Sequence, residues 1–148
     1  MKLSEYLNKN LIFINKDLIS KKSVLEEISK TIASNTECDE DEIFSKLYER
    51  EKLGTTALGN GIAIPHARIK GIENIKIMLM RLTNGIDFDS LDGEKVDIIV
   101  SLVVPNDKSD DHVHILASIA ELLENKIFRA EFRNAKNIDE IVSLISNS

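Results

Sequence analysis

Apolar residues in the first third of the chain recur with helical spacing. Four of them in the segment 20–34 share one helix face: Val24, Leu25, Ile28 and Ile32. The segment 39–53 begins with acidic residues, ends with basic residues and is followed by Gly54. This order matches the helix dipole and a common stop signal, so the pattern predicts two consecutive helices, the first beginning near Ser20.

The middle of the chain changes to extended patterns. Three apolar stretches are expected to form strands: 61–64, 75–83 and 96–104. The last stretch is almost continuously apolar, as a strand covered on both faces should be. Helical patterns return in three segments: 110–125, 127–132 and 137–145. Helices, then strands, then helices predict one α/β domain, residues 1–148, with a central sheet flanked by helices, although the strand order stays open.

Composition narrows the class of partner. The 25 acidic and 19 basic residues give a net charge of −6, which argues against nucleic-acid binding and favours partners with basic surfaces. A single cysteine excludes an internal disulfide. The first ten residues lack the apolar centre of a signal peptide, and no apolar run is long enough to span a bilayer. We therefore expect a cytoplasmic protein without direct membrane insertion.

The stretch REKLGTTALGNGIAIPHA, residues 50–67, contains the first candidate for chemistry. Pro65 has no amide hydrogen and favours an extended Ile64, so we expect the strand to end there and His66 to begin the following loop. Ligands of α/β sheets gather beyond the carboxyl ends of strands, which makes His66 a candidate reactive residue. The alternative is a surface or purely structural histidine.

The other two histidines belong to the helix predicted over 110–125. Helical spacing places His114 on a polar stripe and His112 on the same face as Ile115 and Ile119. We therefore expect His114 to point into solvent and His112 toward the protein body. His112 also lies in the first turn, where backbone amides favour an anion such as phosphate. A structural role for a buried histidine at this position stays open.

Motifs of other site classes are missing. His112 and His114 diverge on a helix, and the chain has neither an HExxH motif nor a cysteine cluster, so no metal is expected. The aspartates between 87 and 92 miss the EF-hand offsets. The segment GTTALGNG lacks the ending and glycine spacing of nucleotide-binding loops, so no cofactor is expected. What remains is an imidazole, a polar glycine loop and two upstream cations, Arg50 and Lys52.

Three stretches of the chain resemble the fructose/mannitol-type IIA domain of the bacterial phosphotransferase system: EREKLGTTALGNGIAIPHAR, IDFDSLDGEKVDIIVSLVVP and DDHVHILASIAELL. The similarity covers essentially the whole chain, and its most specific piece is G-x-G-I-A-I-P-H followed by H-x-x-x-L-A. Because no permease or companion domain accompanies these residues, the chain most resembles the nitrogen-regulatory subgroup. The resemblance implies an α/β sandwich with a mixed sheet.

The resemblance also implies roles for individual residues. His66 matches the family histidine that accepts a phosphoryl group from the small phosphocarrier protein. His112 matches the second histidine, which supports the phosphate, and Arg50 matches the arginine that stabilises charge. The loop glycines would let backbone approach the phosphate, with Thr55 and Asn60 as weaker hydrogen-bonding candidates.

These roles predict a phosphohistidine carrier whose phosphorylation state changes which regulatory target it binds. Within the family, the alternative is a sugar-specific IIA that passes phosphate to a fructose- or mannitol-type permease domain. Two alternatives lie outside this family. One is a binding module that never turns over phosphate, and the other is a zinc hydrolase, which would carry stoichiometric metal.

Overall fold

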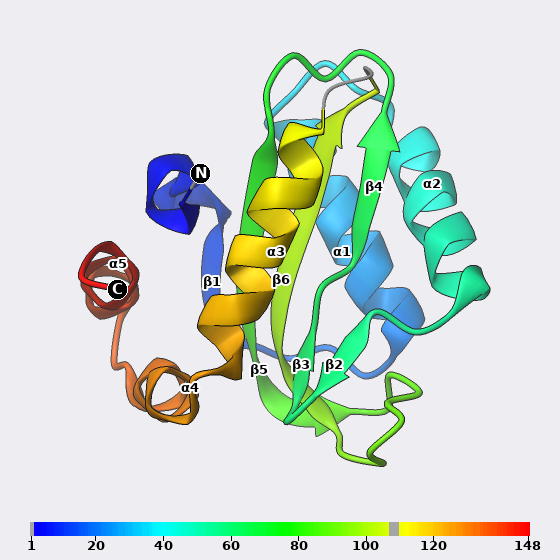
Figure 1. Cartoon of the computed structure of the whole chain (residues 1–148). Coiled ribbons are helices and arrows are strands. Elements are labelled where there is room, and N and C mark those ends of the chain that lie inside the picture. Colours follow the sequence, from blue (N-terminus) through cyan, green and yellow to red (C-terminus); the bar gives the residue numbers. More distant parts are fainter. Residues whose placement is uncertain (1, 107–109) are drawn as a thin grey trace.

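The computed structural model describes residues 2–106 and 110–148 (Figure 1). Its strands are β1 (Ile12–Lys16), β2 (Ala57–Gly59), β3 (Ile62–Ala63), β4 (His66–Ile69), β5 (Lys76–Ile86) and β6 (Val96–Pro105). Its helices are α1 (Lys21–Ser34), α2 (Glu40–Leu53), α3 (Asp111–Glu124), α4 (Lys126–Asn134) and α5 (Ile138–Ser146), preceded by 3-10 turns at Leu3–Tyr6 and Lys9–Leu11.

The strands form one mixed sheet in the order β1-β5-β6-β3-β2, and β4 pairs with β6 beyond the end of β3. Three pairs are parallel, namely β1 with β5, β3 with β6 and β4 with β6. The other two, β5 with β6 and β2 with β3, are antiparallel. The mixed sheet implied by the family resemblance is therefore confirmed.

Hydrophobic clusters on the two faces of the sheet make it the middle layer of a sandwich. On one face α1 and α2 cover a cluster that includes Ile99 and Val103 of β6. On the other face α3, α4 and α5 cover a cluster that includes Val100 and Leu102 of the same strand (Figure 1). Because alternate residues of β6 are buried on opposite faces, the strand is continuously apolar, as its sequence predicted.

The surroundings of Pro65 correct one expectation. The pairs Ile62–Ile98 and His66–Leu102 have the same offset along β6, so β3 and β4 follow one parallel path that is interrupted at Pro65. The amide of Leu102 donates to the carbonyl of Pro65 at 3.0 Å, which keeps that path in register. The prediction that His66 begins a loop beyond the strand is therefore wrong, because His66 is the first residue of β4. Pro65 interrupts the strand without ending it.

The N-terminal part of the chain contains an element that the pattern did not predict. The sequence led us to expect only helices before the central strands, but β1 pairs in parallel with β5 at the edge of the sheet. Helix α1 starts where expected, with the side chain of Ser20 accepting from the amide of Ser23 at 3.1 Å. Within the described residues, no helix combines the length and apolar content that crossing a membrane requires.

Candidate functional site

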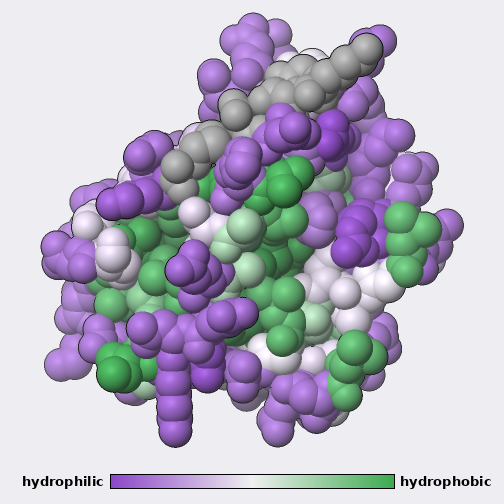
Figure 2. Space-filling view, viewed as in Figure 1, coloured by the Kyte–Doolittle hydropathy of each residue, from purple (hydrophilic) through white to green (hydrophobic). Residues whose placement is uncertain are grey.

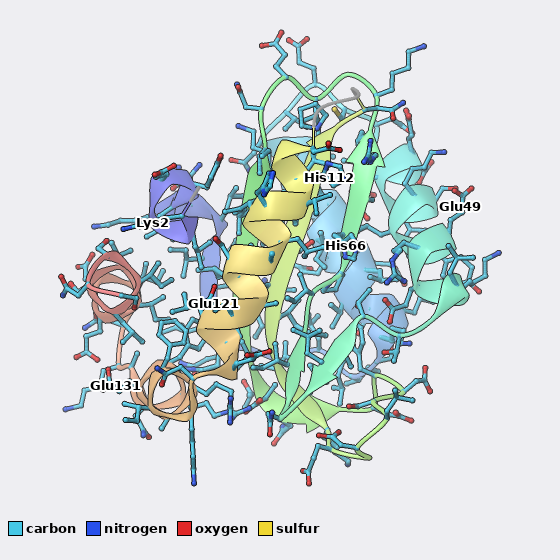
Figure 3. The ribbon with its side chains drawn as sticks, in the orientation of Figure 1. Lys2, Glu49, His66, His112, Glu121 and Glu131 are labelled. Carbon is cyan, nitrogen blue, oxygen red and sulfur yellow. The ribbon has the colours of Figure 1, made fainter. Side chains whose placement is uncertain are left out.

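A cavity of about 560 Å³ lies between α2, β4, the end of β6 and the first turn of α3. Arg50, His66 and His112, which come from three different elements, all line it. Figure 3 shows His66 between α3 and α2, with His112 at the start of α3. The sequence predicted these three residues as one site, and the structure brings them together.

The floor and rim of this cavity differ in polarity. Ala67, Leu102 and Val104 are buried and supply its apolar lining. In the space-filling view, apolar surface shows along the side of α3 that faces α2, with polar side chains around it (Figure 2). Charged side chains also line the cavity. Among the described residues, four of these are cationic, Lys46, Arg50, Arg68 and Lys70, and two are acidic, Glu42 and Glu49. The cavity therefore favours an anion, although the protein as a whole is acidic.

A larger hollow, of about 790 Å³, lies elsewhere between α4 and α5. Its lining in the described residues contains three carboxylates, Glu131, Asp139 and Glu140, and no histidine. Cavity size and candidate chemistry thus point to different places. We place the candidate site in the smaller cavity because a nucleophile and an excess of positive charge coincide there.

The imidazole of His66 is fixed by the backbone of its own strand. Its Nδ1 lies 2.8 Å from the carbonyl oxygen of Ile64, and a carbonyl can only accept. The ring proton therefore resides on Nδ1, and Nε2 carries the lone pair. Ile64 lies past the last paired residues of β2 and β3, where its amide donates to the carbonyl of Thr56 at 3.0 Å. Its carbonyl serves the histidine instead of a neighbouring strand.

The surroundings of His66 keep its ring neutral. Burial lowers the pKa of His66 below its usual value of about 6.5, and the positive charge of Arg50 and the nearby His112 lower it further. The Ile64 carbonyl and the carboxylate of Glu51 raise this pKa but do not outweigh the burial. At neutral pH the Nε2 lone pair is therefore available as a nucleophile.

Arg50 lies in the last turn of α2 and is half-buried. Its Nη1 donates to the carbonyl of Gly54 at 2.8 Å, across the end of the helix. Gly54 caps α2, as its place in the sequence predicted. This bond uses one of several N–H groups of the guanidinium, so the remaining edge can serve an anion in the cavity.

A buried network that the sequence did not indicate lies directly behind Arg50. The carboxylate of Glu51, only 7% exposed, accepts from the amide of Thr56 at 3.0 Å and from its hydroxyl at 2.7 Å. Lys21 of α1 lies 3.1 Å from the same carboxylate and 2.7 Å from Asp89. The network joins α1, the end of α2 and the following loop, so it holds the backbone that carries Arg50. A charged helix residue is ordinarily exposed, and no motif marks this one as buried.

The two weaker candidates lie away from the cavity lining. The hydroxyl of Thr55 donates to the carbonyl of Phe88 and so ties the loop to the β5–β6 connection. Asn60 occupies the β2–β3 turn, where its backbone amide donates to Asp92 at 2.9 Å and its backbone carbonyl accepts from Arg133 at 2.6 Å. The structure thus gives both residues local partners and does not bring Asn60 to the histidines.

One of the loop glycines, Gly61, serves a different purpose from the one expected. Gly61 has a φ of 80°, and a Cβ there would lie 2.4 Å from the guanidinium of Arg133. This guanidinium pairs with Asp97 at 2.9 Å and anchors α4 beside the β2–β3 turn. The close approach that Gly61 permits is therefore an arginine of the same chain, at a turn outside the candidate cavity.

The helix face assigned to each α3 histidine is confirmed. His114 is exposed, whereas His112 is half-buried and lines the cavity. The structure adds Arg68 to the site, because its guanidinium contacts Nε2 of His112. The sequence had not indicated this residue. Side-chain alternation offered a signal for it, since residues 66 and 68 of an extended segment share a face. Within residues 2–106 and 110–148, no group of three or more histidine, cysteine and carboxylate residues is arranged to hold a metal ion.

Nearly the whole chain matches one known family. Residues 5–148 match the family described as "Phosphoenolpyruvate-dependent sugar phosphotransferase system, EIIA 2". The chain belongs to this family. Membership of the EIIA type 2 family agrees with the resemblance seen in the sequence, and it makes the protein a component of a phosphotransferase system.

Similar proteins include two named for nitrogen regulation. The chain is 36% identical over 146 residues to the nitrogen regulatory protein of Pseudomonas aeruginosa, covering 98% of this chain and 95% of that protein. It is 38% identical over 145 residues to the nitrogen regulatory protein homolog of Haemophilus influenzae, covering 95% and 88%. The crystal structure of nitrogen regulatory protein IIA-Ntr from Neisseria meningitidis superposes with a TM-score of 0.92 at 29% identity, covering 97% and 98%.

Proposed function

We propose that this EIIA type 2 protein is a phosphoryl carrier that accepts its phosphoryl group on Nε2 of His66, from the small phosphocarrier protein. The observation that carries the proposal is the 2.8 Å bond between Nδ1 of His66 and the Ile64 carbonyl. It leaves Nε2 as the nucleophile inside a cavity that Arg50 and other cations line. The lowered pKa of His66 supports this role, because a protonated ring could not attack.

The transfer requires no base. The Nε2 lone pair forms the new bond to phosphorus while the bond between phosphorus and the donor breaks, and its electron pair returns to the donor atom. The ring proton stays on Nδ1, which keeps its hydrogen bond to the Ile64 carbonyl. The ring becomes positively charged as the new bond forms, and the dipole of that carbonyl stabilises the charge.

The remaining task is to position and stabilise the moving phosphoryl group. Its transition state is loose and spreads negative charge over the oxygens, so donors placed in advance matter most. Arg50 supplies charge from the end of α2, and His112 supports the group from the first turn of α3. We keep Thr55 and Asn60 out of this set because the Thr55 hydroxyl bonds to the Phe88 carbonyl and Asn60 lies in the β2–β3 turn, outside the cavity lining.

The output we propose is regulatory. A bound phosphoryl group brings about two negative charges into a cavity whose rim is mainly cationic, and this reverses the local electrostatic match with a protein partner. The relatives named as nitrogen regulatory proteins support this output over transfer to a sugar permease domain.

Phosphoenolpyruvate together with the general phosphotransferase proteins tests the acceptor. Intact mass measured without acid should show one added phosphoryl group on the wild-type protein and on His114→Ala, and none on His66→Ala. Label on His66→Ala would refute the assignment. A wild-type protein that stays unmodified after complete donor treatment would favour a binding module instead.

A further inference from the structure

Arg68 joins the two elements that carry the histidines. It lies two residues after His66 on β4, so the two side chains leave the strand on the same face, and both line the cavity. The guanidinium reaches Nε2 of His112 in the first turn of α3. Arg68 is exposed, and its backbone pairs with Val104 of β6. Its position is therefore set by the sheet, while its side chain spans the cavity.

The donor and acceptor of this hydrogen bond can be assigned. A guanidinium can only donate, so Nε2 of His112 must accept with its lone pair, and the ring proton resides on Nδ1. In this arrangement Arg68 donates a hydrogen bond to Nε2 of His112, a residue that lines the cavity. A cation is thus held beside the nucleophile by a contact with an imidazole nitrogen.

A phosphoryl group would be a better partner for this cation. The guanidinium is an ionised donor in either contact, but a phosphoryl group also supplies ionised acceptors, and a guanidinium can bind phosphate oxygens with two parallel bonds. Arg68 shares a strand face with His66, and both residues line the cavity that would receive such oxygens. Resting on the proposed phosphorylation of His66, we propose that Arg68 is a second phosphoryl-binding residue, whose guanidinium moves from His112 to the phosphoryl oxygens when His66 is modified.

The exchange would couple phosphorylation to α3. In the unmodified protein the Arg68–His112 contact connects β4 to the first turn of that helix. When the guanidinium turns to the phosphoryl group, Nε2 of His112 loses its contact with Arg68. The modification is thereby passed from the strand to a helix start at the rim of the cavity.

Two substitutions separate charge from geometry. Arg68→Gln removes the cation, and Arg68→Lys keeps the charge but loses the paired donors. Lys126→Gln removes one positive charge from an exposed position on α4 and serves as the matched control. We expect Arg68→Gln to slow single-turnover labelling of His66 by about 10- to 100-fold, with the KM for the phosphocarrier little changed. Arg68→Lys should recover part of the loss, and Lys126→Gln should behave as wild type.

A spectroscopic measurement separates direct binding from a structural role. The ¹⁵N signals of the Arg68 guanidinium and of His112 Nε2 should both shift when the wild-type protein is phosphorylated. Urea unfolding midpoints equal to wild type would show that the variants are folded.

The outcomes distinguish this inference from the proposed function. Failure of the wild-type protein to accept label would overturn both. Normal labelling of folded Arg68→Gln would overturn only the inference about Arg68. Slow labelling combined with an Arg68 guanidinium signal that ignores phosphorylation would also overturn it, because the arginine would then act through His112 alone.

Discussion

Removing the carboxylate of Glu51 should cost more stability than any other single change near the site. Glu51→Ala would leave the amide and hydroxyl of Thr56 without their 3.0 Å and 2.7 Å partner in a buried place. It would also deprive Lys21 of one of two carboxylates, although Asp89 would stay at 2.7 Å. Breaking a buried pair by deleting one partner costs about 3–5 kcal/mol, and the surviving Asp89 contact places this case near 3 kcal/mol.

Urea unfolding followed by circular dichroism would measure this loss as a lower midpoint with an unchanged m-value. The same loss should lower Tm by roughly 6–12 °C for a chain of this size. Glu49→Ala is the matched control on the same helix, because Glu49 is exposed and its pair with Lys46 is long, at 3.7 Å. It should change stability by less than about 0.5 kcal/mol. A loss under about 1 kcal/mol for Glu51→Ala would show that the network is not the anchor described above.

Four further substitutions test the site and the core. Arg50→Gln should raise the pKa of His66, since a nearby positive charge is removed, so labelling should begin to fall at a higher pH than in the wild type. A pH–rate profile that does not move would contradict the electrostatic role of Arg50. His112→Ala should slow labelling without abolishing it, and His114→Ala should change little. Equal damage in single-turnover assays would contradict the role proposed for His112. Ser101→Ala should hold or raise the unfolding free energy, by up to about 1 kcal/mol, because the buried Ser101 hydroxyl has no hydrogen-bond partner in the described structure. A clear loss in urea unfolding would show that this hydroxyl is satisfied.

The parts of the fold that sequence predicted are those with long periodic patterns. Helices α1 to α5 and strands β5 and β6 each offer enough positions for a helical or extended period to be distinguished. Strand β1 was not predicted, because its five residues are too few to show a period and its stability comes from parallel pairing with a strand more than sixty positions later. Long-range pairing of this kind leaves no mark within a short window.

The residues of the site also differ in how far local sequence could predict them. His66, His112 and Arg50 were found because motifs and helix faces are local properties. The contact between Arg68 and His112 depends on how β4 and α3 pack, and it could not be read from either segment alone. Asn60 shows the opposite error: its nearness in sequence to the histidine suggested a shared role, but the β2–β3 turn carries it to Arg133.

The partner that orients His66 is a main-chain carbonyl, not a side chain. No substitution at position 64 other than one that bends the strand would take this acceptor away. The choice of reacting nitrogen is therefore insulated from genetic drift in the surrounding side chains. Surface residues that take no part in phosphoryl binding can therefore change without altering which nitrogen reacts, so that one chemistry could serve different protein partners over evolutionary time.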